Sequence, residues 1–459
     1  MRPTLAIAQL TLKAAFRYRL VNVLVVLLLG SVVALPMILK HDGTAQGFTQ
    51  ILLTYTLSLI TTLLGFATLW LGCGTLAREV QECQIQMVVV KPIARWQIWL
   101  GKWLGIMTLN ALLLAVSGGA VYFMLQWRAN RLPPEVQMAL RNEVLVARGS
   151  AKMPMPDIEP EVERLMQERL KQTTVAQMDR GFVRKQVQEQ VKARYQLVPP
   201  GSVKPWLIDL GLARYTLKDQ PLYLRVKFNA AAKSASGTFI GVWQVGPPET
   251  PRVWREQMNL APETFTEFEI PPNLFDTNGV LTIFFMNPND TAFIFSPDDG
   301  LEVLYKVGGF GANFVRGVGI IFCWLGLLAS LGLAASSFLS FPVAAFASVA
   351  VLIVGLSSGT IAQVVQEGGV SGVNHDTGVI DTPTLVDFVL LPIFRQLLKL
   401  VNLVEGFSPV DSLSTGRSIT WLELLQAFSQ IVLLIGGILA AIGMISFSRR
   451  ELATAQTQQ

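Results

Sequence analysis

The stretch REVQECQIQMVVVKPIARWQIWLGKWLG, residues 78–105, lies between two long apolar segments and changes character in its middle. In its first half Ile85, Val88 and Val89 recur at i, i+3 and i+4, which predicts a short amphipathic helix. The pair Lys91-Pro92 ends this helix, because proline lacks an N–H group and disfavours helical geometry in the residue before it. The first half is therefore predicted to be a surface helix that stops at the proline.

The second half of this 78–105 segment is rich in tryptophan. Trp96, Trp99 and Trp103 are spaced i, i+3 and i+7, with Arg95 and Lys102 among them. This pattern is typical of a segment that lies at the membrane interface before it turns into the bilayer. An ordinary loop with interfacial tryptophans and positive charges fits the same residues. The chemistry of the segment alone leaves both interpretations open.

The composition indicates an integral membrane protein. Of the 459 residues 51% are hydrophobic and only 15% are charged, whereas a soluble domain carries about a quarter charged residues. The net charge of +5 comes from basic residues at the ends of apolar segments, and no arginine-rich patch interleaved with aromatic residues indicates a nucleic-acid partner. The three cysteines lie far apart without CxxC spacing and there are two histidines, so we expect no disulfide framework and no metal site.

Six uncharged or nearly uncharged segments are long enough to cross a bilayer. They are residues 21–39, 51–71, 103–125, 318–339, 341–362 and 421–447. Residues 1–20 are predicted to form an amphipathic helix on the membrane surface. The basic residues beside both termini and in the 78–105 segment fall on one side of these spans, which predicts a multi-pass protein of the cytoplasmic (inner) membrane with both termini in the cytoplasm.

The chain divides into three predicted regions. Residues 1–125 hold the surface helix and spans one to three, residues 126–313 form an extracytoplasmic domain, and residues 314–459 hold spans four to six and a cytoplasmic tail. An apolar stripe over residues 384–404 predicts short helices on the outer membrane surface.

The extracytoplasmic domain has two predicted parts. Residues 133–195 are charged and helix-prone, which favours a helical hairpin over a flexible charged spacer; residues 203–307 alternate with period two between turn signals, which predicts an antiparallel β-sandwich. The predicted fold class is therefore an α-helical polytopic membrane protein with six transmembrane helices and this large insert between spans three and four.

The sequence carries no signature of catalysis. The spans hold no ionisable group at depth, as an ion-driven transporter normally needs. Gly101-Lys102 is followed by Trp103, so it is no phosphate-binding loop, and neither a nucleophile elbow nor an HExxH motif is present. We therefore expect a non-catalytic chain without a cofactor of its own. If it performs work, the energy enters from a partner, and the 78–105 segment is the predicted receiver.

The order of motifs around this segment resembles the permease subunits of ABC transporters of the type-2, exporter-like class, and among them the gliding-motility and nitrous-oxide-reductase-maturation permeases. The matching positions are Glu82, Pro92, Ala94-Arg95 and Gly101-Lys102. The end of the chain is similar to the family's usual ending at Leu391–Phe394, Val401-Asn402, Gly416-Arg417 and Phe447–Leu452. The likeness covers the spans and their loops, somewhat over half of the chain. Cys83-Gln84 replaces the family's usual Gly-Thr.

The resemblance implies that residues 82–90 form a coupling helix seated in a groove of a separate ATPase, which binds ATP and magnesium. Pro92 and Arg95 would set the elbow that transmits nucleotide-driven closure to the third span, and Glu82 and Arg95 would contact the ATPase. The full set of implied coupling residues is Glu82, Ile85, Val88, Val89, Lys91, Pro92, Arg95, Gly101 and Lys102. The second permease of the dimer would be an identical or a similar chain.

Two functions remain open at this point. The first is a permease that transports or extracts an unknown substrate, with the lipid bilayer around it. The alternative is a membrane-anchored binding or scaffold protein whose β-sandwich recognises a glycan or a protein. A plain anchor needs one span rather than six, so the sequence favours the permease.

Overall fold

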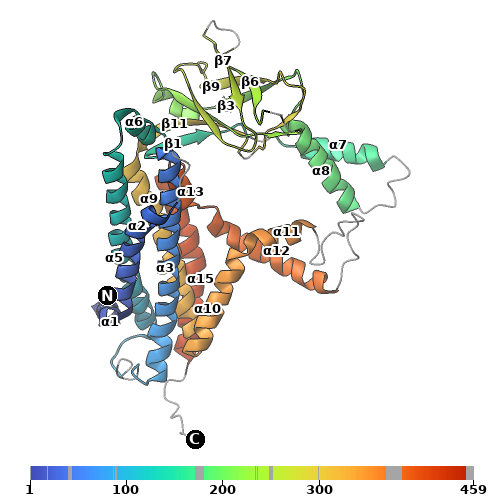
Figure 1. The fold of residues 1–459 in the computed structure, drawn as a ribbon. Helices are drawn as coiled ribbons and strands as arrows, with labels where there is room; N and C mark the ends of the chain where they lie inside the picture. Colours follow the sequence, from blue (N-terminus) through green and yellow to red (C-terminus); the bar gives the residue numbers. More distant parts are fainter. Residues whose placement is uncertain are drawn as a thin grey trace. The chain divides into compact units, whose positions relative to one another are not determined.

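The computed structural model describes residues 2–17, 19–39, 44–85, 87, 90–154, 156–170, 180–232, 234, 236–247, 252–297, 299–367 and 385–450. The chain forms two compact units (Figure 1). The helical unit comprises Met1–Ala147 with Gly308–Gln459, and the β unit comprises Arg148–Val307. The predicted boundary at residue 126 falls inside a long helix, α5, so the helical unit continues about 20 residues further than the apolar pattern indicated.

Among the described residues of the helical unit, four stretches of helix are long and apolar enough to cross a membrane. They lie in α3 (Ala45–Gln81), α5 (Arg95–Ala129), α9 (Phe310–Ser336) and the continuous run of α14 (Trp421–Ala427), η2 (Phe428–Gly436) and α15 (Gly437–Arg449). Two bent pairs raise the number to six if each pair is one span. The prediction of a polytopic helical protein with a β domain is therefore confirmed at this level.

One bend separates the predicted surface helix, residues 1–20, from the first predicted span, residues 21–39, whereas the other interrupts a span predicted to be straight. α1 (Arg2–Arg17) and α2 (Arg19–Ile38) meet at a bend of 70°. α10 (Phe341–Leu356) and α11 (Ser358–Glu367) meet at a bend of 56°, which interrupts the predicted span 341–362 at Ser357. Further along the chain lie α12 (Leu385–Glu405), which continues through Pro392, and the short α13 (Pro409–Ser414).

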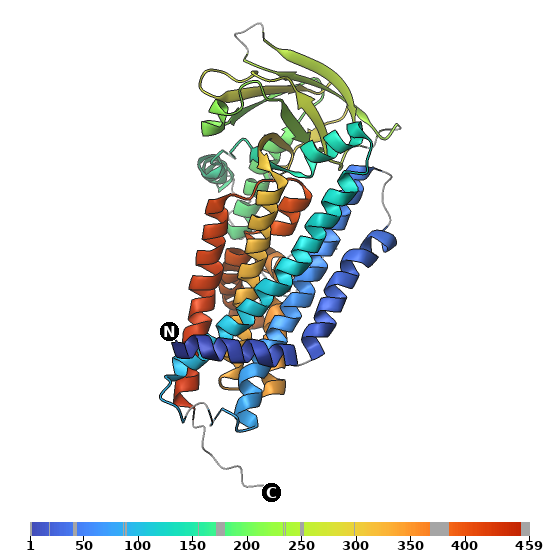
Figure 2. The same cartoon turned by 90° about the vertical axis from the view of Figure 1, so that its left-hand side faces the viewer.

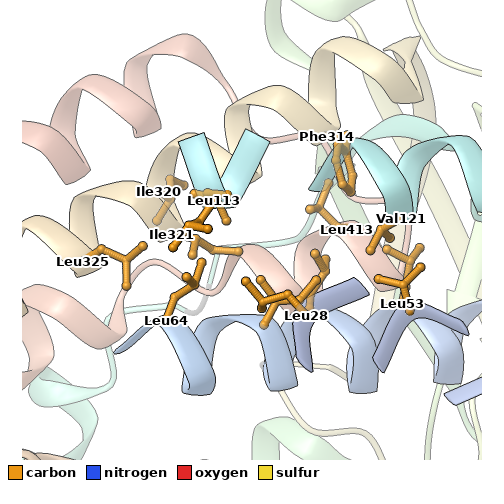
Figure 3. Packing of buried hydrophobic residues seen from close by; sticks show 14 of the residues in the cluster. Leu28, Leu53, Leu64, Leu113, Val121, Phe314, Ile320, Ile321, Leu325 and Leu413 are labelled. Carbon is orange, nitrogen blue, oxygen red and sulfur yellow. The ribbon is translucent and has the colours of Figure 1, made fainter. Parts of the chain in front are cut away.

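The core of the helical unit is built on α3, α5 and α9. Figure 3 shows its buried side chains, among them Leu53 and Leu64 of α3, Leu113 of α5 and Ile321 of α9. In a bilayer the hydrophobic effect does not drive apolar helices together, because lipid tails are as apolar as their side chains. Close van der Waals packing through small residues holds such helices together instead. Gly72 of α3 illustrates this packing, because a Cβ there would lie only 3.2 Å from the Cα of Gly332 in α9.

The connection before the last helix is also tightly held. Gly416 has φ +71°, and a Cβ on it would lie 2.4 Å from the carbonyl oxygen of Glu143, at the end of α6 (Pro134–Glu143). The buried Asn313 side chain donates to the carbonyl oxygen of Arg417 at 2.7 Å and accepts from the amide of Ile419 at 2.7 Å. Glycine at this position and the asparagine on α9 together fix where the last helix begins.

The described residues of the β unit form three sheets with the strand orders β1-β11-β4-β8, β2-β10-β5 and β3-β9-β6-β7. The first consists of β1 (Val146–Ala151), β11 (Leu301–Gly309), β4 (Leu222–Val226) and β8 (Thr266–Ile270). The second consists of β2 (Leu197–Val198), β10 (Phe293–Ile294) and β5 (Asn229–Ala230). The third consists of β3 (Val203–Asp209), β9 (Val280–Met286), β6 (Phe239–Val245) and β7 (Trp254–Leu260).

The two four-stranded sheets share one apolar core. Trp243 of β6 faces Phe285 of β9 across an antiparallel pair, and both are fully buried beside Leu224 of β4 and Val303 of β11. Alternate residues of β6 are buried, as a strand with one face on a core requires. This is the packing that a β-sandwich uses.

Two helices of the β unit pack on each other, α7 (Glu159–Leu170) and α8 (Arg180–Gln196). Val162, Val187 and Val191 form their shared apolar contact, and Arg194 pairs with Glu161 at 3.3 Å. These helices correspond to the predicted hairpin, although residues 171–179 between them lie outside the described residues. The earlier part of the predicted hairpin is α6, which belongs to the helical unit.

Candidate functional site

The 78–105 segment is mostly an extension of two long helices. α3 continues to Gln81 with Glu82 as its C-cap, and α5 begins at Arg95, eight residues before the predicted start of the third span. Between them, residues 82–85 lie in turns and Met87 is helical. The predicted helix over residues 82–90 is therefore not helical at its start, and Val88 and Val89 lie outside the described residues.

The residue that follows the C-cap of α3 is Cys83. Its φ of +56° is left-handed, a conformation that commonly follows a helix C-cap and that glycine adopts without steric strain. Glycine is also the residue that the resembling permeases place at this position. Cysteine therefore occupies a backbone geometry that costs an L-residue about 1 kcal/mol.

Replacing Cys83 with glycine is expected to raise the free energy of unfolding by about 0.5–1 kcal/mol, because the strain of the left-handed Cβ disappears. Thermal unfolding of the detergent-solubilised full chain measures this change. Cys83→Ala is the matched control, since it removes the thiol but keeps the Cβ. Equal stability of the glycine and alanine variants would contradict the strain argument.

The residues after the turn divide between surface and interior. Ile85 is buried with Trp99 and Phe447 in one apolar cluster. Met87 and Val90 are 72% and 86% exposed. Lys91 and Pro92 are exposed as well. The turn is thus anchored by Ile85 and presents an apolar surface flanked by a positive charge.

Arg95 holds the end of the last helix. Its Nη1 donates to the carbonyl oxygens of Phe447 at 3.1 Å, Ser448 at 2.6 Å and Arg450 at 2.9 Å. The last carbonyls of a helix have no donor within the helix and carry a partial negative charge, so a guanidinium there is favourable. Arg95 is therefore bound within the chain itself, a contact that the resemblance to permeases did not imply.

Arg450 extends this contact to a third helix. Its Nη1 donates to the carbonyl oxygens of Ser336 at 3.4 Å and Ser337 at 3.2 Å, where α9 ends. Nearby, the guanidinium carbon of Arg78 lies 4.1 Å from the ring centroid of Phe341, the first residue of α10. The start of α5 and the ends of α15 and α9 are thus joined by a chain of guanidinium contacts, which we call the arginine clamp (Arg95 and Arg450).

Lys102 is buried, with 3% of its surface exposed. Its Nζ donates to Glu79 Oε1 at 2.6 Å and to the carbonyl oxygen of Thr75 at 2.9 Å, both on α3. Placing an ammonium inside requires such partners, because an unpaired buried charge is very costly. Lys102 therefore joins α5 to α3, and Glu79, its partner, was missed in the sequence because the pair is 23 residues apart.

The tryptophans do not share one surface. Trp96 is 51% exposed, but Trp99 is fully buried. Trp103 is half-buried and its Nε1 donates to the carbonyl oxygen of Gly326 in α9 at 3.2 Å. Gly443 of the last helix makes room for the Trp99 indole, since a Cβ there would lie 2.9 Å from Trp99 Nε1. Of the three, Trp96 has the exposure expected of an interfacial tryptophan.

Gly101 and Gly105 accommodate the N-terminal helix. A Cβ on Gly101 would lie 2.8 Å from the carbonyl oxygen of Thr4, and one on Gly105 would lie 2.7 Å from the Cβ of Thr11. Figure 2 shows α1 lying across α5 at this point. The spacing Gly-x-x-x-Gly is the known signal for close helix approach. It was present in the sequence, where Gly101 was singled out and Gly105 was not.

Replacing Gly105 with leucine is expected to displace α1 from α5 and to lower the free energy of unfolding by about 1–3 kcal/mol, as overpacking does. Hydrogen exchange over residues 2–17 measures the displacement, and thermal unfolding measures the stability. Gly119→Leu, on the same helix, is the control, because no heavy atom lies within 4 Å of a Cβ there. Equal protection of α1 in both variants would exclude the packing role.

The β unit contains a second candidate site, a cavity of about 500 Å³ between β2, β3 and the segments around Pro154 and Pro297. Two cations, Arg194 and Lys204, line its wall. Lys204 is the more buried of them. It donates to the carbonyl oxygen of Tyr195, and its Nζ lies 5.2 Å from the ring centroid of Trp206. Burial lowers the pKa of Lys204 from 10.5 to about 8.

Because the pKa of Lys204 is lowered on folding, the folded chain binds fewer protons than the unfolded chain between pH 8 and pH 10.5. The free energy of unfolding is therefore expected to rise with pH across this window. Acetylation of Lys204, followed by peptide mass spectrometry, is expected to show a midpoint near pH 8 in the folded protein and near 10.5 in denaturant. A midpoint near 10.5 in both states would contradict the burial.

No family model matches the chain, and no curated protein or solved structure matches it. Among the described residues, no group of three His, Cys, Asp or Glu side chains lies close enough together to hold a metal ion. The residues themselves therefore carry the functional argument. Two features are candidates for a function. In the 78–105 segment, side chains join the ends of several helices, and the β unit contains a cavity.

Proposed function

We propose that the chain is the permease subunit of an ATP-binding-cassette transporter, and that the 78–105 segment receives force from a separate ATPase subunit. ATP and magnesium belong to that subunit. A second permease, identical or similar, completes the transporter, and the substrate is unknown. In this proposal the protein lies in the cytoplasmic membrane with both termini and the 78–105 segment in the cytoplasm, and the β unit is extracytoplasmic.

The observation that carries the proposal is the junction of helices at the 78–105 segment. The arginine clamp joins the start of α5 to the ends of α15 and α9, and Lys102 joins α5 to α3. A displacement of the turn would therefore reach four long helices at once. Coupling of this kind requires packed elements in contact rather than an isolated surface loop.

The exposed apolar side chains of Met87 and Val90 are the natural docking point. They lie three residues apart in the sequence, and a hydrophobic groove on a partner would remove their apolar surface from water. The carboxylate of Glu82 accepts from its neighbour Gln84 at 2.7 Å and is exposed, so it is accessible to a cation on the partner.

A pull-down from native membranes tests the proposal. The tagged full chain is expected to co-purify with a nucleotide-binding subunit, identified by mass spectrometry. Met87→Asp and Val90→Asp are expected to remove that subunit. Met138→Asp, a comparably exposed methionine on α6, is the control and is expected to retain it. Absence of an ATPase from the wild-type preparation would refute the permease.

The alternative, a membrane-anchored binding or scaffold protein, rests on the cavity of the β unit. It predicts partners that depend on the β unit and are indifferent to Met87 and Val90. The same pull-down separates the two functions, because its variants alter the helical unit alone.

A further inference from the structure

The cavity of the β unit is lined by several prolines. Among the described lining residues, five are prolines: Pro154, Pro156, Pro199, Pro205 and Pro297. Proline has no N–H group, so these walls present CH₂ surface and carbonyl oxygens but no amide donors. Trp206, Phe295 and Leu301 are among the other apolar residues of the lining. The volume of the cavity lies within the range of small-molecule binding sites.

Two backbone amides close to the cavity are already used. The amide of Phe295 donates to the carbonyl oxygen of Gln196 at 3.0 Å, and the amide of Ser202 donates to that of Pro199 at 3.2 Å. A glycan would have to exchange the water bonds of its many hydroxyl groups for a few polar side chains, such as Gln196, Ser202 and Ser296, which is unfavourable. An apolar chain has no hydrogen bonds to water to give up, and its transfer from water into the cavity is favourable.

One positive charge faces this apolar space. Lys204 carries three N–H bonds, and its hydrogen bond to the carbonyl oxygen of Tyr195 uses one of them. The other cation of the wall, Arg194, is already paired with Glu161. An anion beside Lys204 would thus meet a partly desolvated ammonium, where a charge-assisted hydrogen bond is strong.

We propose that this cavity binds one long-chain amphiphile with an anionic head, its chain along the proline walls and its head at Lys204. A free fatty acid and an anionic phospholipid share this chemistry. The proposal goes beyond the permease and stands without it.

Photolabelling of the full chain in phosphatidylcholine nanodiscs tests the site. Three probes carry the same diazirine-bearing chain: palmitic acid, hexadecanol and phosphatidylglycerol. Palmitate is expected to label peptides that contain residues 153–156, 196–206 or 295–301, in competition with unlabelled palmitate. Hexadecanol is expected to label these peptides about tenfold less, since it has no charge for Lys204. Stronger labelling by phosphatidylglycerol than by palmitate would identify the phospholipid as the source.

Two lysine variants complete the test. Lys204→Met keeps the length of the side chain and is expected to lower labelling by the preferred anionic probe about tenfold, while Lys204→Arg restores it. Lys218→Met, at an exposed lysine of the same unit, is expected to change nothing. Equal labelling by palmitate, phosphatidylglycerol and hexadecanol in the wild type, or labelling no stronger in these peptides than elsewhere in the β unit, would overturn the proposal. The wild-type comparison stands even if a variant fails to fold.

Discussion

Replacing Arg95 with methionine is expected to release the last turn of the final helix. Methionine keeps most of the apolar stem but donates to none of the three carbonyl oxygens that Arg95 now holds, on Phe447, Ser448 and Arg450. Charge-assisted hydrogen bonds at partly exposed helix ends contribute about 2 kcal/mol together. The opening equilibrium of this turn should therefore rise by about 30-fold.

Amide hydrogen exchange over residues 445–450 measures this change. Arg128→Met, at the opposite end of α5, serves as the control and is expected to leave the exchange unaltered. Within the proposed transporter, Arg95→Met should still bind the ATPase, because Met87 and Val90 are untouched, yet ATP hydrolysis should no longer move the last helix. Unchanged exchange in Arg95→Met would show that the arginine clamp contributes nothing to the helix end.

The second large effect is expected at the ion pair between Glu79 and Lys102. Glu79→Ala leaves a buried ammonium with the carbonyl of Thr75 as its partner, and we expect the free energy of unfolding to fall by about 3 kcal/mol. Lys102→Met should cost only about 1 kcal/mol, because Glu79 is one-third exposed and reaches water.

A double-mutant cycle tests whether the unpaired charge of Lys102 causes the loss of stability in Glu79→Ala. The combined Glu79→Ala/Lys102→Met variant is expected to be more stable than Glu79→Ala alone, since it removes the unpaired charge. Chemical unfolding in detergent measures all three variants, with Glu82→Ala as an exposed control on the same helix end. If the double variant is no more stable than Glu79→Ala, burial of the charge is not the cause.

The sequence predicts the long apolar helices well, because bilayer thickness sets their length and an uncharged apolar run of about 20 residues is typical of a membrane span. It predicts their ends poorly. α3 and α5 extend past the apolar windows into residues that carry Arg78, Glu79 and Lys102. These charges are tolerated inside a helix because they find partners on neighbouring helices, which no local pattern reveals.

In the β unit, too, the sequence pattern indicates some elements clearly and others poorly. The period-two alternation on which the prediction for residues 203–307 rests is clear in strands such as β4 and β9 and weak in β3 and β7. β3 contains Pro205, and β7 carries Arg255, Glu256 and Gln257. Both are edge strands of their sheet, where proline and charged residues are common because they prevent further pairing. The features that hid these strands from the sequence pattern follow from their place at the edge.

In the site, the motif positions were recognised but their partners were not. Gly101 and Lys102 were singled out as a pair, while α1 and Glu79, which give them their roles, required the fold. The contact of Arg95 with an ATPase stays a prediction, while in the structure its guanidinium contacts residues more than 350 positions away. Contacts across such separations depend on topology.

This separation has a consequence for biosynthesis. Arg95 is translated about 350 residues before its carbonyl partners at Phe447, Ser448 and Arg450. While those intervening residues are made, the guanidinium of Arg95 is without these three acceptors. A chain that stops before residue 447 inserts most of its helices yet never closes this end. The junction of helix ends can close only after residue 450 has been made.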